Sequence, residues 1–388
     1  MTGLLLLLLA QVAAAPNPQT NDVIVVGRRA EKELAACLAR QCPPAQEVEA
    51  SLQASVEQFA DGRYPDARRT LQRAIDRNKR YAATLPGPVS SLYATLATVA
   101  EHEGDAQLWR TASRNNLLTL REQLGETNVA TMREELQFAD DMVSQGSWRL
   151  GDDTYAKIQR RAVAGGRNDI AAAAAFRRAW LALALTRTHD AERFADEAVT
   201  LAGPGDATMA QLREIVRTRI AIRKGDDGAV DALAARIRQA NDGRPTLLYA
   251  PPVEDINPPP QLVDNGMQRD RGIRFADVGY WIRPDGTVVD AELLRTNGLG
   301  QWSPVILKHV RARRYVPLRL TEGQPGLYRI DRFTVRGTQS TPTGTRLSQR
   351  MGPLSVHIID LTETEAMSDA HRQRIAQGIP PTVPTGVN

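Results

Sequence analysis

The sequence predicts an α+β protein in which an all-α helical-hairpin solenoid is followed by a small α+β domain. Three features of the 388-residue chain support this prediction. Apolar residues make up 42% of the chain and aromatic residues only 5%, with alanine and leucine prominent, a composition that favours packed helices. Related turn segments recur at nearly constant spacing up to residue 243, and from residue 266 apolar residues alternate as in strands.

The first 15 residues have the pattern of a secretory signal peptide. Leu4–Ala10 is apolar but too short to span a bilayer. Ala13–Ala15 precede Pro16 and match the small-residue cleavage pattern, although no Lys or Arg precedes the apolar run. We therefore expect export to the periplasm, cleavage after Ala15, and a mature protein without a transmembrane anchor.

Residues 16–45 are expected to form an extended N-terminal segment that contains both cysteines of the chain, Cys37 and Cys42. Export places these cysteines in an oxidising compartment, which favours a local Cys37–Cys42 disulfide. No histidine lies near them in sequence, and their spacing is a poor zinc pattern. No metal site or cofactor is expected.

Residues 46–243 show helical periodicity that is interrupted at regular intervals. The interruptions centre on five positions: Gly62, Gly104, Gly146, His189 and Gly225. Their spacings are 42, 42, 43 and 36 residues. Each unit has room for two helices joined by a tight turn, so the period predicts stacked helical hairpins.

The first unit resembles a tetratricopeptide repeat. Gly62, Tyr64, Ala67, Leu71 and Ala74 follow that family's small and bulky spacing, and the other units match more loosely. The resemblance implies a concave surface that binds peptides or proteins. A helical spacer without a ligand is the alternative.

A change of pattern marks the second half of the chain. Residues 244–265 are proline-rich and are expected to form a linker, residues 266–365 a small α+β domain, and residues 366–388 a flexible tail. The domain's expected order is a strand, a Pro-Asp-Gly turn, a second strand, a helix and further strands. These elements are assigned to Phe275–Ile282, Thr287–Arg295, Trp302–Arg313, Tyr315–Leu320, Leu327–Gly337 and Ser355–Thr362.

This order resembles the C-terminal domain of TonB, an energy-transducing periplasmic protein. The similar region covers about residues 270–337 and rests on VGYWIRPDGTVVDAELLRTNG and WSPVILKHVRARRYVPLR. Asp285-Gly286, Asn297-Gly298 and Tyr315-Val316-Pro317 match that family's turn, loop and strand-start positions. TonB itself has an uncleaved membrane anchor and a long proline-rich spacer, so the resemblance extends to fold and partner type and not to energy transduction.

The segment NDVIVVGRR (residues 21–29) resembles the apolar box with which TonB-dependent receptors add a strand to TonB. A partner-binding role is therefore predicted for Val23, Ile24, Val25, Val26, Arg28 and Arg29. Pairing with this chain's own sheet and a linker role remain alternatives.

Residues 266–350 carry 15 basic and 7 acidic residues, which gives this stretch a charge of +8 in a chain of net charge +4. Its densest cluster, Arg311, Arg313 and Arg314, is predicted to meet an acidic partner, with a solvated surface as the alternative. Export disfavours nucleic acid as the partner.

No catalytic residue is predicted, because the sequence lacks the P-loop, zincin and nucleophile-elbow motifs and its five histidines are dispersed. The expected function is therefore a non-catalytic protein-binding scaffold of the cell envelope, linked to TonB-type transport, whose partners are envelope proteins such as TonB or a TonB-dependent receptor. A periplasmic enzyme whose site is built from scattered residues is the alternative.

Overall fold

A computed structural model of the chain describes residues 29–362, apart from residues 145, 227, 238–244, 255–271, 301, 321–323, 341–343, 346 and 348. The described residues form helices followed by antiparallel sheets, so the α+β class is confirmed. The predicted signal peptide, residues 16–28 of the predicted N-terminal segment and the predicted tail lie outside these residues.

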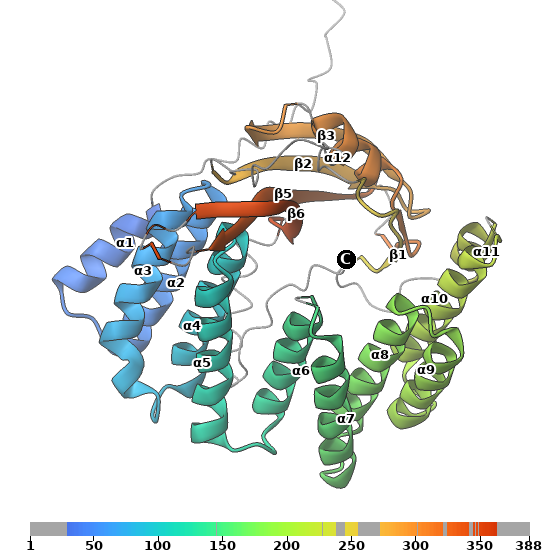
Figure 1. Ribbon diagram of the computed structural model, residues 1–388, viewed down its shortest axis with the longest axis horizontal. Coiled ribbons are helices and arrows are strands. Elements are labelled where there is room, and N and C mark those ends of the chain that lie inside the picture. Colours follow the sequence, from blue (N-terminus) through green and yellow to red (C-terminus); the bar gives the residue numbers. More distant parts are fainter. Residues whose placement is uncertain are drawn as a thin grey trace, which may run out of the picture.

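The helical half consists of consecutive helices packed side by side in an arc (Figure 1). These helices are α1 (Arg29–Ala39), α2 (Pro44–Ala60), α3 (Tyr64–Asn78), α4 (Pro86–Glu103), α5 (Ala106–Leu124), α6 (Val129–Ser144), α7 (Trp148–Ala164), α8 (Asn168–Ala184), α9 (Thr188–Ala202), α10 (Ala207–Arg223) and α11 (Ala229–Arg236), with a 3₁₀ turn at Lys79–Tyr81. Helix α1 lies in the segment expected to be extended, because its alanine, glutamate and leucine content favours a helix.

The five predicted turns lie between α2 and α3, α4 and α5, α6 and α7, α8 and α9, and α10 and α11. Glycine occupies four of them with a positive φ, as at Gly62 and Gly104. The fourth turn is centred on Thr186, which has a φ of 61°, rather than on His189, which lies in the first turn of α9.

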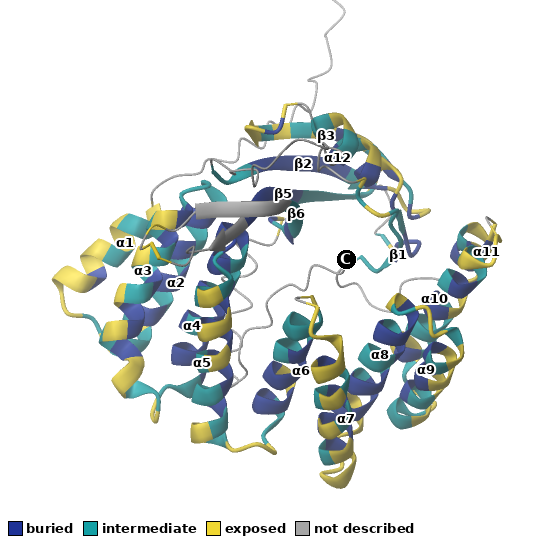
Figure 2. Ribbon diagram, in the orientation of Figure 1, coloured by how far each residue is buried: buried dark blue, intermediate teal, exposed yellow. Residues whose placement is uncertain are grey.

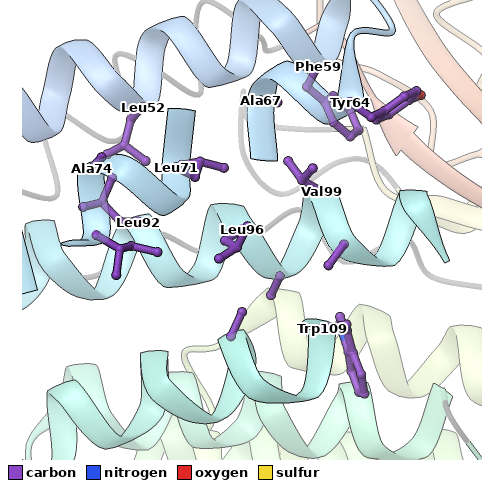
Figure 3. Close-up of a cluster of buried hydrophobic side chains, with 14 of the residues drawn as sticks. Leu52, Phe59, Tyr64, Ala67, Leu71, Ala74, Leu92, Leu96, Val99 and Trp109 are labelled. Carbon is purple, nitrogen blue, oxygen red and sulfur yellow. The ribbon is translucent and has the colours of Figure 1, made fainter. Parts of the chain in front are cut away.

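Apolar side chains at helical spacing join the first hairpins into one core (Figure 3). Leu52 of α2 lies near Leu71 of α3, Phe59 of α2 packs on Tyr64 of α3, and Leu92 of α4 continues the same cluster. Trp109 of α5 is buried at its edge. Each helix therefore buries its apolar stripe on its neighbours, as stacked hairpins require.

The second half is a four-stranded antiparallel sheet in the order β3-β2-β5-β6. Its strands are β2 (Arg274–Ile282), β3 (Val288–Asn297), β5 (Leu327–Ser340) and β6 (Gln349–Asp360). Helix α12 (Ser303–Arg311) covers one face, where Val278, Tyr280, Ile306, Val310 and Phe333 form the core.

The predicted strand from Tyr315 to Leu320 is shorter than expected. Strand β4 spans only Arg314–Tyr315 and pairs with β1 (Leu247–Tyr249), which lies within the predicted linker.

The sheet lies across the arc from its first helices to its last (Figure 1). At one end, Phe275 of β2 and Ile359 of β6 join the core of α2, α3 and α4. At the other end, Leu248 of β1 and Val316, which follows β4, pack with Ile215 of α10 and Leu233 of α11. Buried residues consequently continue from the helices into the overlying strands (Figure 2).

None of the helices within the described ranges is both long enough and apolar enough to cross a bilayer.

The turns of the first two hairpins lie directly beneath the sheet. A Cβ on Gly62 would lie 2.7 Å from Phe275 Cε1, and one on Gly104 would lie 2.7 Å from Arg336 Cδ and 2.8 Å from the Gly337 carbonyl oxygen. A Cβ on Gly146, in the third hairpin, would meet nothing within 4 Å.

We therefore expect Gly146→Ala to lower the free energy of unfolding by about 1–2 kcal/mol, the cost of a left-handed backbone. Gly62→Ala and Gly104→Ala should each lose a further ~1–3 kcal/mol, because the added methyl group collides with the sheet. Denaturant unfolding of the three variants measures the difference. Equal losses would contradict the placement of the sheet on these turns.

Candidate functional site

The predicted partner-binding residues of the N-terminal segment lie at or before the start of the described chain. Val23, Ile24, Val25, Val26 and Arg28 lie outside the described residues. Arg29 is the first residue of α1, where its exposed side chain pairs with Glu33 at 2.8 Å.

The three arginines of the predicted basic cluster have different environments. Arg311 is exposed and its Nη2 donates to the Ala291 carbonyl of β3 at 3.1 Å. Arg313 is buried and forms an ion pair with Asp331. Arg314 Nη2 lies 2.8 Å from Asp231 Oδ1 of α11, so it joins the sheet to the last helix. The cluster therefore does not form one basic surface patch.

The two cysteines form the predicted disulfide. Cys37 and Cys42 are bonded, with their Cα atoms 5.2 Å apart. Cys37 is buried near the C-terminus of α1, and the bond closes the turn between α1 and α2.

Arg332 is one of the largest fully buried side chains of the described residues, and it lies between the sheet and the helices. Its Nε lies 2.7 Å from Asp277 Oδ1, and its Nη2 lies 2.9 Å from Asp277 Oδ2, a bidentate pair between β5 and β2. The same guanidinium donates to the carbonyls of Phe59, at 2.6 Å, and Ala60, at 2.5 Å. These carbonyls lie at the end of α2, where the helix dipole is negative, and the Phe59 carbonyl also accepts from the Gly62 N–H at 2.9 Å.

Two further arginines of the sheet bind helix C-termini. Arg295 of β3 donates to the Ala60 carbonyl and lies 2.9 Å from Asp277. Arg336 Nε donates to the carbonyls of Glu101, at 2.8 Å, and His102, at 3.0 Å, at the end of α4. The sheet thus satisfies backbone acceptors of both α2 and α4.

His102 lies beneath the sheet, with its Nδ1 2.8 Å from the Thr334 hydroxyl. Burial lowers the pKa of His102 well below its usual value, and the nearby His357, Arg336 and Arg332 act in the same direction. The imidazole is therefore neutral at physiological pH.

Glu101, His357 and Ser355 follow one another in hydrogen-bonding order. His357 Nδ1 lies 3.0 Å from Glu101 Oε1, and His357 Nε2 lies 3.2 Å from Ser355 Oγ. This is the order of a hydrolase triad. However, Ser355 Oγ also accepts from Arg336 Nη1 at 2.7 Å, and the Arg336 guanidinium is held on the end of α4. We therefore conclude that Glu101, His357 and Ser355 hold strand β6 on helix α4 rather than act in catalysis.

The outer strands of the sheet offer the candidate binding site. No described strand pairs with the outer side of β3 or of β6. An open sheet edge presents backbone N–H and C=O groups that can accept an added strand. On β3, Leu294 is 40% exposed, so an apolar side chain accompanies the open edge.

A hydrogen-bonded row of polar side chains crosses three helices of the arc. Ser90 of α4 donates to Asn116 of α5, and Asn116 donates to Glu134 of α6. Burial raises the pKa of Glu134 to about 8, with a smaller contribution from the negative charge of Asp141. Burial likewise raises the pKa of Asp141 to about 7, with Glu101 adding to the effect.

The described part of the chain contains no group of three or more His, Cys, Asp or Glu side chains arranged to hold a metal ion. The residues that join the sheet to the helices were not identified from the sequence. The signal was the spacing of Arg332, Thr334 and Arg336 in LYRIDRFTVRG, which places three polar side chains on one face of β5.

The buried carboxyl of Glu134 should make stability depend on pH. Its pKa is raised in the fold, so the folded state holds a proton that the unfolded chain releases near pH 4.5, and stability is lost as the pH rises towards 8. We expect Glu134→Gln to raise the free energy of unfolding at pH 8.5 by on the order of 2 kcal/mol, with little change at pH 5.

The matched control is Glu135→Gln, which removes a carboxylate paired with Arg121 and Arg161 and should destabilise the fold at pH 8.5. Thermal unfolding at the two pH values measures both variants. An equal effect of Glu134→Gln at both pH values would show that this carboxyl ionises normally in the folded protein.

Comparison with known proteins gives little similarity. No protein-family model matches the sequence, and no curated protein matches it. The crystal structure of BtubC (BKLC) from P. vanneervenii is similar at a TM-score of 0.42 and 13% sequence identity, over 54% of this chain and 86% of that chain. A similarity at this level assigns neither fold nor function.

Proposed function

We propose that this protein is an exported, non-catalytic scaffold of the cell envelope that binds other proteins and is linked to TonB-type transport. The observation that carries the proposal is the antiparallel sheet with open edges on β3 and β6 among the described residues. Such edges bind extended peptides through the backbone, while alternate side chains provide specificity.

The helical half supports a scaffold role. Its consecutive hairpins follow the turn spacing of the sequence, and stacked hairpins of this kind present extended surfaces to protein or peptide ligands. We propose that residues 46–243 are tetratricopeptide-like repeats and that the sheet with α12 is a TonB C-terminal-like domain.

The disulfide supports export. Bonds such as Cys37–Cys42 persist in oxidising compartments, which agrees with the apolar leader and with a periplasmic location.

In this proposal the partner is TonB, a TonB-dependent receptor or another envelope protein. The strand-forming residues are Val23–Val26, flanked by Arg28 and Arg29. Of the basic residues near α12, Arg311 is exposed and Arg314 is partly exposed, so these two can meet a partner, whereas Arg313 is buried against Asp331.

Deleting residues 21–28 should weaken binding of the protein to a TonB C-terminal domain at least tenfold, because the added strand would be lost. Isothermal titration calorimetry measures the affinity. Deletion of residues 369–388, a segment at the other terminus, is the control and should leave affinity unchanged. An affinity unaffected by the first deletion would refute docking through this segment.

A further inference from the structure

Strand β3 is an edge strand with an exposed apolar side chain. It pairs with β2 alone among the described strands, and Leu294 on it is 40% exposed. The Ala291 carbonyl, near the middle of β3, already accepts a hydrogen bond from the Arg311 guanidinium. The part of the edge from Glu292 to Asn297 is therefore the part that needs a partner.

The described chain begins beside the C-terminal end of this strand. The backbone N–H of Ala30, in the first turn of α1, donates to Glu57 Oε2 of α2 at 2.7 Å. Glu57 lies one helical turn before Ala60, whose carbonyl accepts from Arg295 of β3. The chain thus enters α1 close to where β3 crosses the end of α2.

The opposite edge of the sheet contacts other parts of the helical half, although Ile359 of β6 also packs in the core of α2, α3 and α4. Strand β6 contacts α4, through His357 and Glu101 at 3.0 Å. Helix α1 packs on α2, and Figure 1 places it on the opposite side of α2 and α3 from α4. Because β3 contacts the end of α2, the helix on which α1 packs, we place the segment that precedes Arg29 on β3.

We propose that residues 22–28 of this chain pair with the outer edge of β3 as a fifth, parallel strand. The strand is parallel to β3 because the segment ends at Arg29, and Arg29 lies next to the C-terminal end of β3. Seven extended residues span about 23 Å, long enough to pass Leu294 and the whole open part of the edge.

The sequence of the segment fits this position. Val23, Ile24, Val25 and Val26 are β-branched, which favours an extended strand, and alternate members of a strand added to β3 would share the face of the sheet on which Leu294 lies. The pairing needs no second protein. It goes beyond the proposed partner binding, since a partner that binds the same segment would have to displace it from β3.

Hydrogen–deuterium exchange of the isolated protein, expressed from residue 16, tests the proposal. The backbone amides within Glu292–Asn297 that point away from β2 should exchange at least tenfold more slowly than in the Ile24→Pro/Val25→Pro variant. Adjacent residues of a strand point their N–H groups to opposite sides, so one of the two prolines removes a bond to β3 in either register. The Ile24→Thr/Val25→Thr variant keeps two β-branched residues and should retain the protection.

Peptides from α8 and α9 report on the integrity of the fold and should exchange alike in all three proteins. Identical exchange of Glu292–Asn297 in the wild type and the proline variant would overturn the proposal. A loss of protection in β6 instead of β3 would also overturn it, because the segment would then occupy the other edge. No partner is present, so either result is independent of the calorimetric test of TonB binding.

Discussion

The structure depends on one buried guanidinium. Arg332 pairs with Asp277 of the neighbouring strand and, at the same time, binds the last carbonyls of α2. A buried arginine is costly to desolvate, and this site meets that cost with a bidentate carboxylate and with the negative end of a helix dipole. The Arg332–Asp277 pair joins strands β5 and β2. The contacts of Arg332 with the Phe59 and Ala60 carbonyls hold the sheet on the helices.

Further contacts join the sheet to other helices, so that the sheet is held at both ends. Arg336 repeats the arginine-to-carbonyl contact on α4, and at the far end Val316 and Arg314 bind the last helices. The sheet therefore contacts both ends of the arc (Figure 1). One face of the sheet is covered by α12 and part of the other rests on the hairpins, so its edges are where a further strand can be added.

Periodicity in the sequence predicted most of the secondary structure. The turns at Gly62 and Gly104 and the β2–β3 hairpin follow local patterns, and local patterns are readable without knowing the fold. The junction was not predicted. The alternation of Arg332, Thr334 and Arg336 places polar side chains on one face of β5, but it does not identify their partners, because Arg332 meets residues about 270 positions earlier in the chain. For the same reason Arg313 was assigned to the surface cluster, although Asp331 holds it in the core.

A double-mutant cycle on Arg332 and Asp277 tests the role of the junction most directly. We expect Arg332→Met to lower the free energy of unfolding by about 3–5 kcal/mol, because it removes the buried bidentate partner of Asp277 and leaves that carboxylate with the partly exposed Arg295. Asp277→Asn should also destabilise, and the double variant should lose clearly less than the sum of the two single losses. Single losses below about 1 kcal/mol that add independently, as at an exposed ion pair, would contradict the account.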